Sequence, residues 1–210
     1  MTILLQPNRN NMNFDSKKSY TLENNVVLLR PLLETDIEHL LPFANNEPDI
    51  WKYSMVSAAG QEGMQNYIST ALSLRNEGKD YPFIVFDKRS NKYAGSTRFY
   101  DIQPSADTVQ LGFTWYGKDF QGTGLNRHCK YLMLQFAFEV MGVYRVEFRA
   151  DSRNQRSIAA MKSIGCTVEG TLRSNGYTPD GNRRDSTVLS ILRDEWEEST
   201  KVNLFKKLTF

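Results

Sequence analysis

Cysteine is scarce in this chain: the 210 residues contain only two, Cys129 and Cys166. They form no Cys-x-x-Cys pair and have no neighbouring pair of histidines, so a metal site is not expected. Cys129 falls on the apolar face of a predicted helix, where a thiol packs as a small hydrophobic group. The cysteine content therefore gives no indication of an oxidising compartment.

Long apolar runs are also absent, since none approaches the roughly 20 residues that a membrane-spanning helix requires. The first twenty residues have no basic segment followed by an apolar one, so they do not look like a signal peptide. Lys and Arg number 26 against 24 Asp and Glu, a balance that does not indicate a nucleic-acid or membrane partner. We therefore expect a soluble, cytoplasmic protein.

The composition that is present, 40% apolar and 24% charged residues, suits one globular domain of ordinary size. Residues 1–20 are rich in asparagine and lack periodicity, so we expect an N-terminal extension that is either disordered or lies over the domain. Residues 21–210 contain no repeat and no linker, and we expect them to form a single domain.

Hydrophobic periodicity and turn residues predict a mixed series of strands and helices. The predicted strands cover residues 26–30, 81–87, 92–100, 108–115, 143–150, 167–173 and 184–192, and the predicted helices cover residues 35–44, 61–77, 125–140, 154–164 and 195–201. The clearest helix places Leu125, Cys129, Met133 and Phe136 on one apolar face. The order of elements predicts an α/β arrangement in the broad sense, a mixed sheet with helices on both faces.

The segment from Gln121 to Asn126 lies where a predicted strand gives way to this long helix. Gly122 and Gly124 allow a tight turn and a close approach of the backbone to a ligand. The first N–H groups of a helix lack partners and form its positive end, so a phosphate fits there. No Gly-Lys-Ser/Thr follows and no third glycine is present, which argues against a P-loop and a dinucleotide fingerprint. The glycines alone indicate either an anion site or a plain helix-start turn.

The stretch from Val109 to Gly170 resembles the GNAT N-acetyltransferases, and most of all the branch of the ribosomal-protein N-terminal (RimJ/RimL-like) acetyltransferases. The family's pyrophosphate motif, Gln/Arg-x-x-Gly-x-Gly/Ala, reads Gln121-x-x-Gly124-x-Asn126 here, and asparagine at the last position is familiar in this branch. A looser resemblance extends over residues 26–196. It implies the GNAT fold, with a central, twisted, mostly antiparallel sheet, and transfer of an acetyl group from acetyl-CoA to an amine.

In that family acetyl-CoA lies in a V-shaped opening between the fourth and fifth strands. The resemblance implies contacts to pantetheine from the backbone of Phe113, Thr114 and Trp115, and to pyrophosphate from Gln121, Gly122, Thr123, Gly124, Leu125 and Asn126. Asn154 matches the asparagine that hydrogen-bonds pantetheine, and Ser157 follows it in the same helix. Arg127 and Lys130 either meet the adenosine 3′-phosphate or belong to a solvated helix face.

Direct acetyl transfer needs a base for the ammonium proton of the acceptor. Many relatives carry a Glu where this chain has Gln110, which cannot take a proton at neutral pH but could hold a water molecule. Glu147 on the next strand is an alternative catalytic carboxylate, or an outward-facing structural residue. A residue in the loop 47–49 is a further alternative.

A proton donor for the leaving thiolate is the second requirement. The tyrosine that many GNAT enzymes use is replaced by Met161 here. The ribosomal-protein branch instead has a serine three residues after the asparagine, and Ser157 matches it. The resemblance therefore implies Ser157 as donor, and the competing interpretation is a serine that satisfies only local backbone groups.

The acceptor is expected between the loop 42–60 and the last hairpin, residues 173–184. Trp51, Tyr53 and Gln110 are the candidate contacts, although single aromatic residues are more often core. Arg184 and its neighbours in the hairpin either attract an acidic partner or solvate a turn.

The acceptor itself is predicted to be a protein N-terminus or a small-molecule amine. Because Gln110 and Met161 leave two usual catalytic positions vacant, an acyl-CoA-binding sensor without turnover is the alternative. Dimers are common among relatives, so a homodimer is a hypothesis by analogy.

Overall fold

The computed structural model describes residues 12–208, in which the predicted elements recur in the predicted order. The strands are β1 (Leu22–Glu23), β2 (Val27–Pro31), β3 (Tyr81–Asp87), β4 (Lys92–Gln103), β5 (Thr108–Tyr116), β6 (Arg145–Asp151), β7 (Thr167–Tyr177) and β8 (Arg183–Leu192). The α-helices are α1 (Ile37–Asn46), α2 (Gly60–Asn76), α3 (Leu125–Gln135), α4 (Gln155–Ser163), α5 (Arg193–Glu195) and α6 (Lys201–Phe205). No helix within the described range is both long and apolar enough to cross a membrane.

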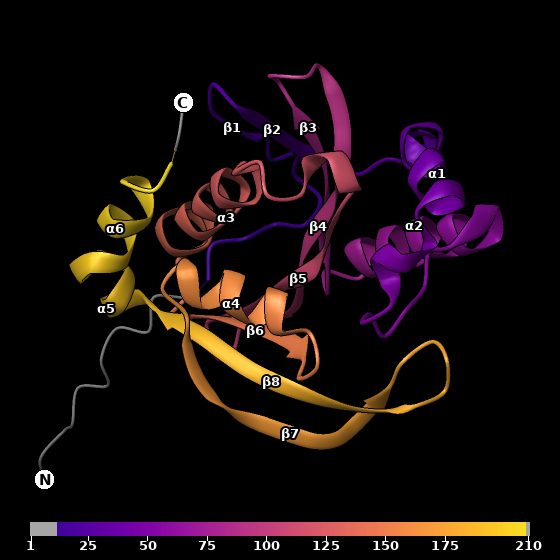
Figure 1. The fold of residues 1–210 in the computed structure, drawn as a ribbon. Coiled ribbons are helices and arrows are strands. Elements are labelled where there is room, and N and C mark those ends of the chain that lie inside the picture. Colours follow the sequence, from indigo (N-terminus) through magenta and orange to yellow (C-terminus); the bar gives the residue numbers. More distant parts are fainter. Residues whose placement is uncertain (1–11, 209–210) are drawn as a thin grey trace, which may run out of the picture.

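The eight strands form one sheet in the order β1-β2-β3-β4-β5-β6-β8-β7. Neighbouring strands are antiparallel, except that β5 and β6 run parallel. Figure 1 shows α1 and α2 on one side of this twisted sheet and α3 on the other, next to α4 and the C-terminal helices. The predicted mixed sheet with helices on both faces is therefore confirmed.

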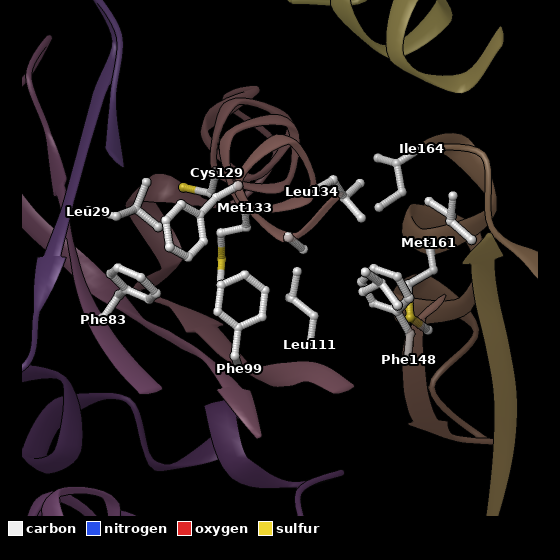
Figure 2. Close-up of a cluster of buried hydrophobic side chains, with 14 of the residues drawn as sticks. Leu29, Phe83, Phe99, Leu111, Cys129, Met133, Leu134, Phe148, Met161 and Ile164 are labelled. Atoms are coloured by element: carbon white, nitrogen blue, oxygen red, sulfur yellow. The ribbon is translucent and has the colours of Figure 1, made fainter. Parts of the chain in front are cut away.

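The larger apolar cluster fills the space between the sheet and α3. Phe83 and Phe99 project from β3 and β4 towards Cys129 and Met133 of α3, and all four are fully buried (Figure 2). Burial of each such side chain contributes about 1.5–3 kcal/mol relative to exposure. This packing fixes α3, and with it the preceding loop, against the sheet.

A second cluster packs α1 and α2 against the opposite face. Ile84, between two residues of β3 that face α3, points to Leu40 and Met64 because side chains alternate along a strand. Trp115 near the end of β5 joins the same cluster. The sheet is thus covered on both faces at its centre.

Residues 12–20 are the described part of the expected N-terminal extension, and they lie against the domain. The Asn13 N–H donates to the carbonyl of Met141 (2.8 Å), and the Tyr81 hydroxyl donates to the carbonyl of Lys18 (2.8 Å). Phe14 packs edge-on against Tyr81. Residues 1–11 lie outside the described part of the chain.

The pairing between β5 and β6 is short. It ends at Gln110 and Glu147, although β5 continues to Tyr116 and β6 to Asp151. On its other edge β5 carries a bulge, because the register with β4 shifts around Phe113, whose φ is +48°. Since a bulge bends its strand and raises the local twist, β5 turns away from β6 beyond this point.

A buried ion pair braces the bulge from the β4 side. The Arg98 guanidinium donates to the Asp80 carboxylate (3.0 Å), and both side chains are almost fully buried. The guanidinium also lies over the rings of Phe113 (4.1 Å to the centroid) and Tyr67 (4.7 Å). The conformation of β5 at Phe113 therefore depends on a charge that Asp80 compensates.

We predict that Asp80→Ala lowers the free energy of unfolding by about 3–5 kcal/mol, because it leaves the Arg98 cation buried and unpaired. Urea unfolding measures the change. The exposed pair of Glu77 and Lys79 provides the control, and Glu77→Ala should leave the stability unchanged. Equal effects of the two variants would contradict the bracing role of Asp80.

Candidate functional site

A cavity of about 950 Å³ opens where β5 and β6 diverge. Of the residues that the sequence singled out, its lining includes Trp51, Tyr53, Gln110, Phe113, Thr114, Trp115, Gln121, Gly122, Gly124, Asn126, Asn154 and Ser157. Three others, Thr123, Leu125 and Glu147, do not line it. The fold therefore brings segments from both halves of the chain to one opening.

The glycine loop adopts the conformation that its glycines allow. Gly122 and Gly124 have φ values of +78° and +87°, in the left-handed region that other residues rarely occupy. Gly124 precedes the first turn of α3, in which the Arg127 N–H donates to the Gly124 carbonyl (2.9 Å) and the Leu125 N–H donates to the Thr123 hydroxyl (3.4 Å). The positive end of the helix dipole therefore lies at the glycine loop. The Thr123 hydroxyl donates to the Phe120 carbonyl (2.9 Å), and Leu125 is buried in the core. These two residues shape the loop from behind.

Gln121 ties the loop to its surroundings. Its amide nitrogen donates to the carbonyl of Tyr116 (2.8 Å), and its amide oxygen accepts from Arg156 of α4 (2.7 Å). The Tyr116 hydroxyl donates to the side-chain oxygen of Asn126 (3.2 Å). The end of β5, the loop and α4 are thereby held together around the cavity.

Asn154 and Ser157 stand at the start of α4. The Asn154 side-chain oxygen accepts from the backbone N–H of Ser157 (3.1 Å), so Asn154 caps the helix. The Ser157 hydroxyl has no hydrogen-bond partner within residues 12–208. Satisfaction of local backbone groups therefore does not explain this serine, and its hydroxyl is free for a ligand.

Lys130 of α3 is buried, although one expectation from the sequence was a solvated helix face. It is only 5% exposed, so its assignment to a solvated helix face is wrong, whereas Arg127 is exposed. Its ammonium nitrogen donates to the Thr114 hydroxyl (2.7 Å), and it lies over the Phe148 ring. Lys130 thus spans the gap between β5 and β6. Burial lowers the pKa of Lys130 to about 7, so a large fraction of the amine is neutral near neutral pH.

At the other end of the cavity Gln110 is held by Asp101. The Gln110 amide nitrogen donates to Asp101 Oδ2 (2.6 Å), which fixes the side-chain orientation. The Gln110 side-chain oxygen is buried and has no partner in the described chain. A buried acceptor without a donor is unfavourable, so this oxygen suits a donor group on a ligand.

Glu147 is differently placed. Its two carboxylate oxygens accept from Arg149 (2.7 Å) and Arg145 (2.8 Å). Because both oxygens are occupied and the side chain lies outside the cavity lining, the geometry favours a structural role over proton transfer.

The predicted aromatic contacts divide between core and cavity. Trp51 is 2% exposed and packs edge-on against Trp115, with ring centroids 5.3 Å apart. Trp51 nevertheless lines the cavity, and its buried indole nitrogen has no partner among the described residues. Tyr53 is half-buried at the rim.

Several lining residues were not found from the sequence. They are Tyr67, Tyr100, Asp101, Arg149, Asn175 and Ser186, whereas Asp49, which also lines the cavity, belongs to the loop 47–49 that the sequence had singled out. Tyr67 fits the apolar face of its helix, so its hydroxyl gave no separate signal, although it donates to the Phe113 carbonyl (3.3 Å). The remaining side chains depend on the register between strands that are distant in the sequence.

A family model described as an acetyltransferase (GNAT) domain matches residues 27–167, which is more than half of the chain. The chain belongs to the GNAT acetyltransferase family. "Probable N-acetyltransferase YjcK" of Bacillus subtilis is 26% identical to this GNAT protein over 183 residues, 84% of this chain and 99% of YjcK.

Solved structures of GNAT proteins share the fold. A GCN5-related N-acetyltransferase from Brucella melitensis superimposes with a TM-score of 0.83 at 22% identity, covering 93% of this chain and 88% of that one. RimJ of Mycobacterium smegmatis, solved in complex with CoA-disulfide, superimposes with a TM-score of 0.73 at 18% identity, covering 90% of this chain and 93% of the RimJ chain. This GNAT protein is accordingly an acetyl-CoA-dependent acyltransferase.

The pKa of Lys130 predicts a pH dependence of stability in the protein without acetyl-CoA. An unfolded lysine has a pKa near 10.4, so between about pH 7 and pH 10 the unfolded state holds a proton that the folded state lacks. The free energy of unfolding should therefore rise with pH in this window, by up to about 1.4 kcal/mol per pH unit from this group.

Urea unfolding of wild type and Lys130→Met across that window isolates the contribution. Near pH 7 Lys130→Met should have a larger free energy of unfolding than the wild type. This excess should shrink towards pH 10. Lys92→Met, at an exposed position on β4, is the control and should follow the wild-type curve. A constant difference between wild type and Lys130→Met would show that Lys130 keeps an ordinary pKa.

Proposed function

We propose that this GNAT protein transfers the acetyl group of acetyl-CoA directly to a primary amine, on a protein N-terminus or a small molecule. The observation that carries the proposal is a single cavity that joins the glycine loop at one end to the unpartnered Gln110 oxygen at the other. Both substrates of a direct transfer must occupy one opening, and this cavity is large enough for a pantetheine arm and an amine.

The cofactor end has the chemistry that a CoA molecule needs. The first turn of α3 offers N–H groups to a pyrophosphate. Beyond Gln110 the edge of β5 that faces β6 lacks a strand partner, so its backbone groups are available to the amides of pantetheine. Acetyl-CoA, once bound, supplies an acetyl group activated as a thioester.

The acceptor end positions the amine. The Gln110 side-chain oxygen accepts a hydrogen bond from the amine nitrogen, in an orientation set by Asp101. The Asp101 carboxylate also lines the cavity, and its two oxygens accept from the neutral amides of Gln110 and Gln103 (2.6 Å each), not from arginines as in Glu147. Asp101 therefore takes the proton that the ammonium group loses. Ser157 donates from its free hydroxyl to the sulfur that leaves, and Glu147 has no part in this proposal. Positioning of the two reactants supplies much of the acceleration.

Release of free CoA in the presence of amines tests the proposal. The purified protein should bind acetyl-CoA and release CoA with at least one member of a panel of small amines and peptides with free N-termini. Peptides acetylated at the N-terminus are the matched controls and should give no release above background. Binding of acetyl-CoA without release for any amine would instead identify a sensor.

Gly122→Val tests the cofactor site. The valine side chain would crowd the phosphate position at a φ that it rarely adopts, so the Kd for acetyl-CoA should rise at least about tenfold. Gly181→Val in the β7–β8 turn is matched, because both glycines have similar φ values and open space around the added Cβ. Calorimetric titration should show unchanged affinity for Gly181→Val, and equal losses would place the phosphate elsewhere.

A further inference from the structure

Two polar side chains on β8 border the cavity without a partner. Arg184 is 7% exposed and Ser186 is 1% exposed, and both face the opening. The Arg184 Nε and the Ser186 Oγ have no hydrogen-bond partner, and no carboxylate within residues 12–208 forms an ion pair with Arg184. The two residues share one face of the strand because they are two positions apart.

An unpaired buried guanidinium is unfavourable, since arginine keeps its charge in proteins and burial removes the water that stabilises it. Burial accordingly lowers the pKa of Arg184. Arg98 in the same sheet is also buried, but its guanidinium bonds to the Asp80 carboxylate. Arg184 is buried as well, but no carboxylate of residues 12–208 bonds to it.

The neighbouring carboxylates are already occupied. Both oxygens of Asp151, across from Ser186 in the sheet, accept from Arg153 at 2.7 and 2.9 Å. Glu147 lies between two other arginines. Asp151 attracts the Arg184 cation through space, but its oxygens bond to Arg153. Within residues 12–208 no carboxylate bonds to the Arg184 guanidinium, so a bonding partner is expected from a ligand.

We propose that Arg184 and Ser186 form a subsite for a carboxylate carried by the acceptor amine. The proposal rests on the amine acetyltransferase function above and names its substrate class, an amine that also carries a carboxylate. The guanidinium presents several N–H donors in a plane, which match the two oxygens of a carboxylate. The Ser186 hydroxyl adds a further donor.

The strand register indicates how far the carboxylate lies from the amine. Gln110 is level with Glu147 on β6, and Ser186 is level with Asp151, four residues further on. Four residues of strand span about 13 Å, and the two strand spacings from β5 across β6 to β8 add about 10 Å at right angles. This spacing favours a carboxylate several bonds from the amine, as in an acidic side chain near the N-terminus of a peptide, over the α-carboxylate of a free amino acid.

Two matched pairs of acceptors test the subsite and separate these sources. One pair is a short C-terminally amidated peptide with Glu at its second position and the same peptide with Gln there. The other pair is a free amino acid and its amide. In at least one pair the acid should have a kcat/KM about ten- to hundredfold above that of its neutral partner, as expected for a hydrogen-bonded charge pair.

Arg184→Gln should bring that ratio close to one, because the acid loses its advantage over the neutral acceptor. Arg183→Gln is the control, because Arg183 is exposed on the other face of β8 and bonds to Ser174. It should retain the wild-type ratio. Loss of the ratio in both variants would reflect a general effect of charge and would overturn the subsite.

A measurement on the wild-type protein does not depend on the folding of a variant. The N-acetylated Glu peptide should compete with the acceptor more tightly than the N-acetylated Gln peptide. Equal inhibition, and equal kcat/KM within both acceptor pairs, would overturn the subsite while amine-dependent CoA release still supported the acetyltransferase. Absence of CoA release with every amine would overturn both.

Discussion

The separation of β5 from β6 after the Gln110–Glu147 pair is the constraint on which the rest of the site depends. Two parallel strands that stayed paired would satisfy each other's backbone groups and leave no opening. The bulge at Phe113 bends β5 away, and Arg98 supports the bulge from the neighbouring strand. The cavity therefore originates in backbone geometry, and the side chains that line it act on an opening that already exists.

The two ends of the cavity are lined by different elements, because different helices cover the two faces of the sheet. α3 and α4 bring the positive start of one helix and the capping residue Asn154 of the other to the cofactor end. On the opposite side, the loop after α1 and the β7–β8 hairpin contribute Trp51 and Arg184. In the proposed function, acetyl-CoA thus meets mainly backbone donors and the acceptor mainly side chains.

The sequence predicts the fold well where the determinants are local. The face of α3, the glycines at Gly122 and Gly124, and the cap at Asn154 are each recognisable within a few residues. β1 was missed because two residues carry no periodicity, and the burial of Lys130 was missed because it depends on the gap between β5 and β6. The sequence also could not predict that Arg184 lacks a bonded carboxylate, since this depends on which other arginines bond to carboxylates that are distant in the sequence.

Three buried cations show how the same physical penalty is met in three ways. Arg98 keeps its charge and has Asp80 beside it, so the penalty is offset within the protein. Lys130 can lose its proton, and burial between two strands shifts its equilibrium towards the neutral amine. A guanidinium has no such option, and Arg184 has no carboxylate in contact. Of the three, only Arg184 therefore lacks both a bonded anion within the described chain and a neutral form, and the carboxylate that we propose for the acceptor supplies the missing partner.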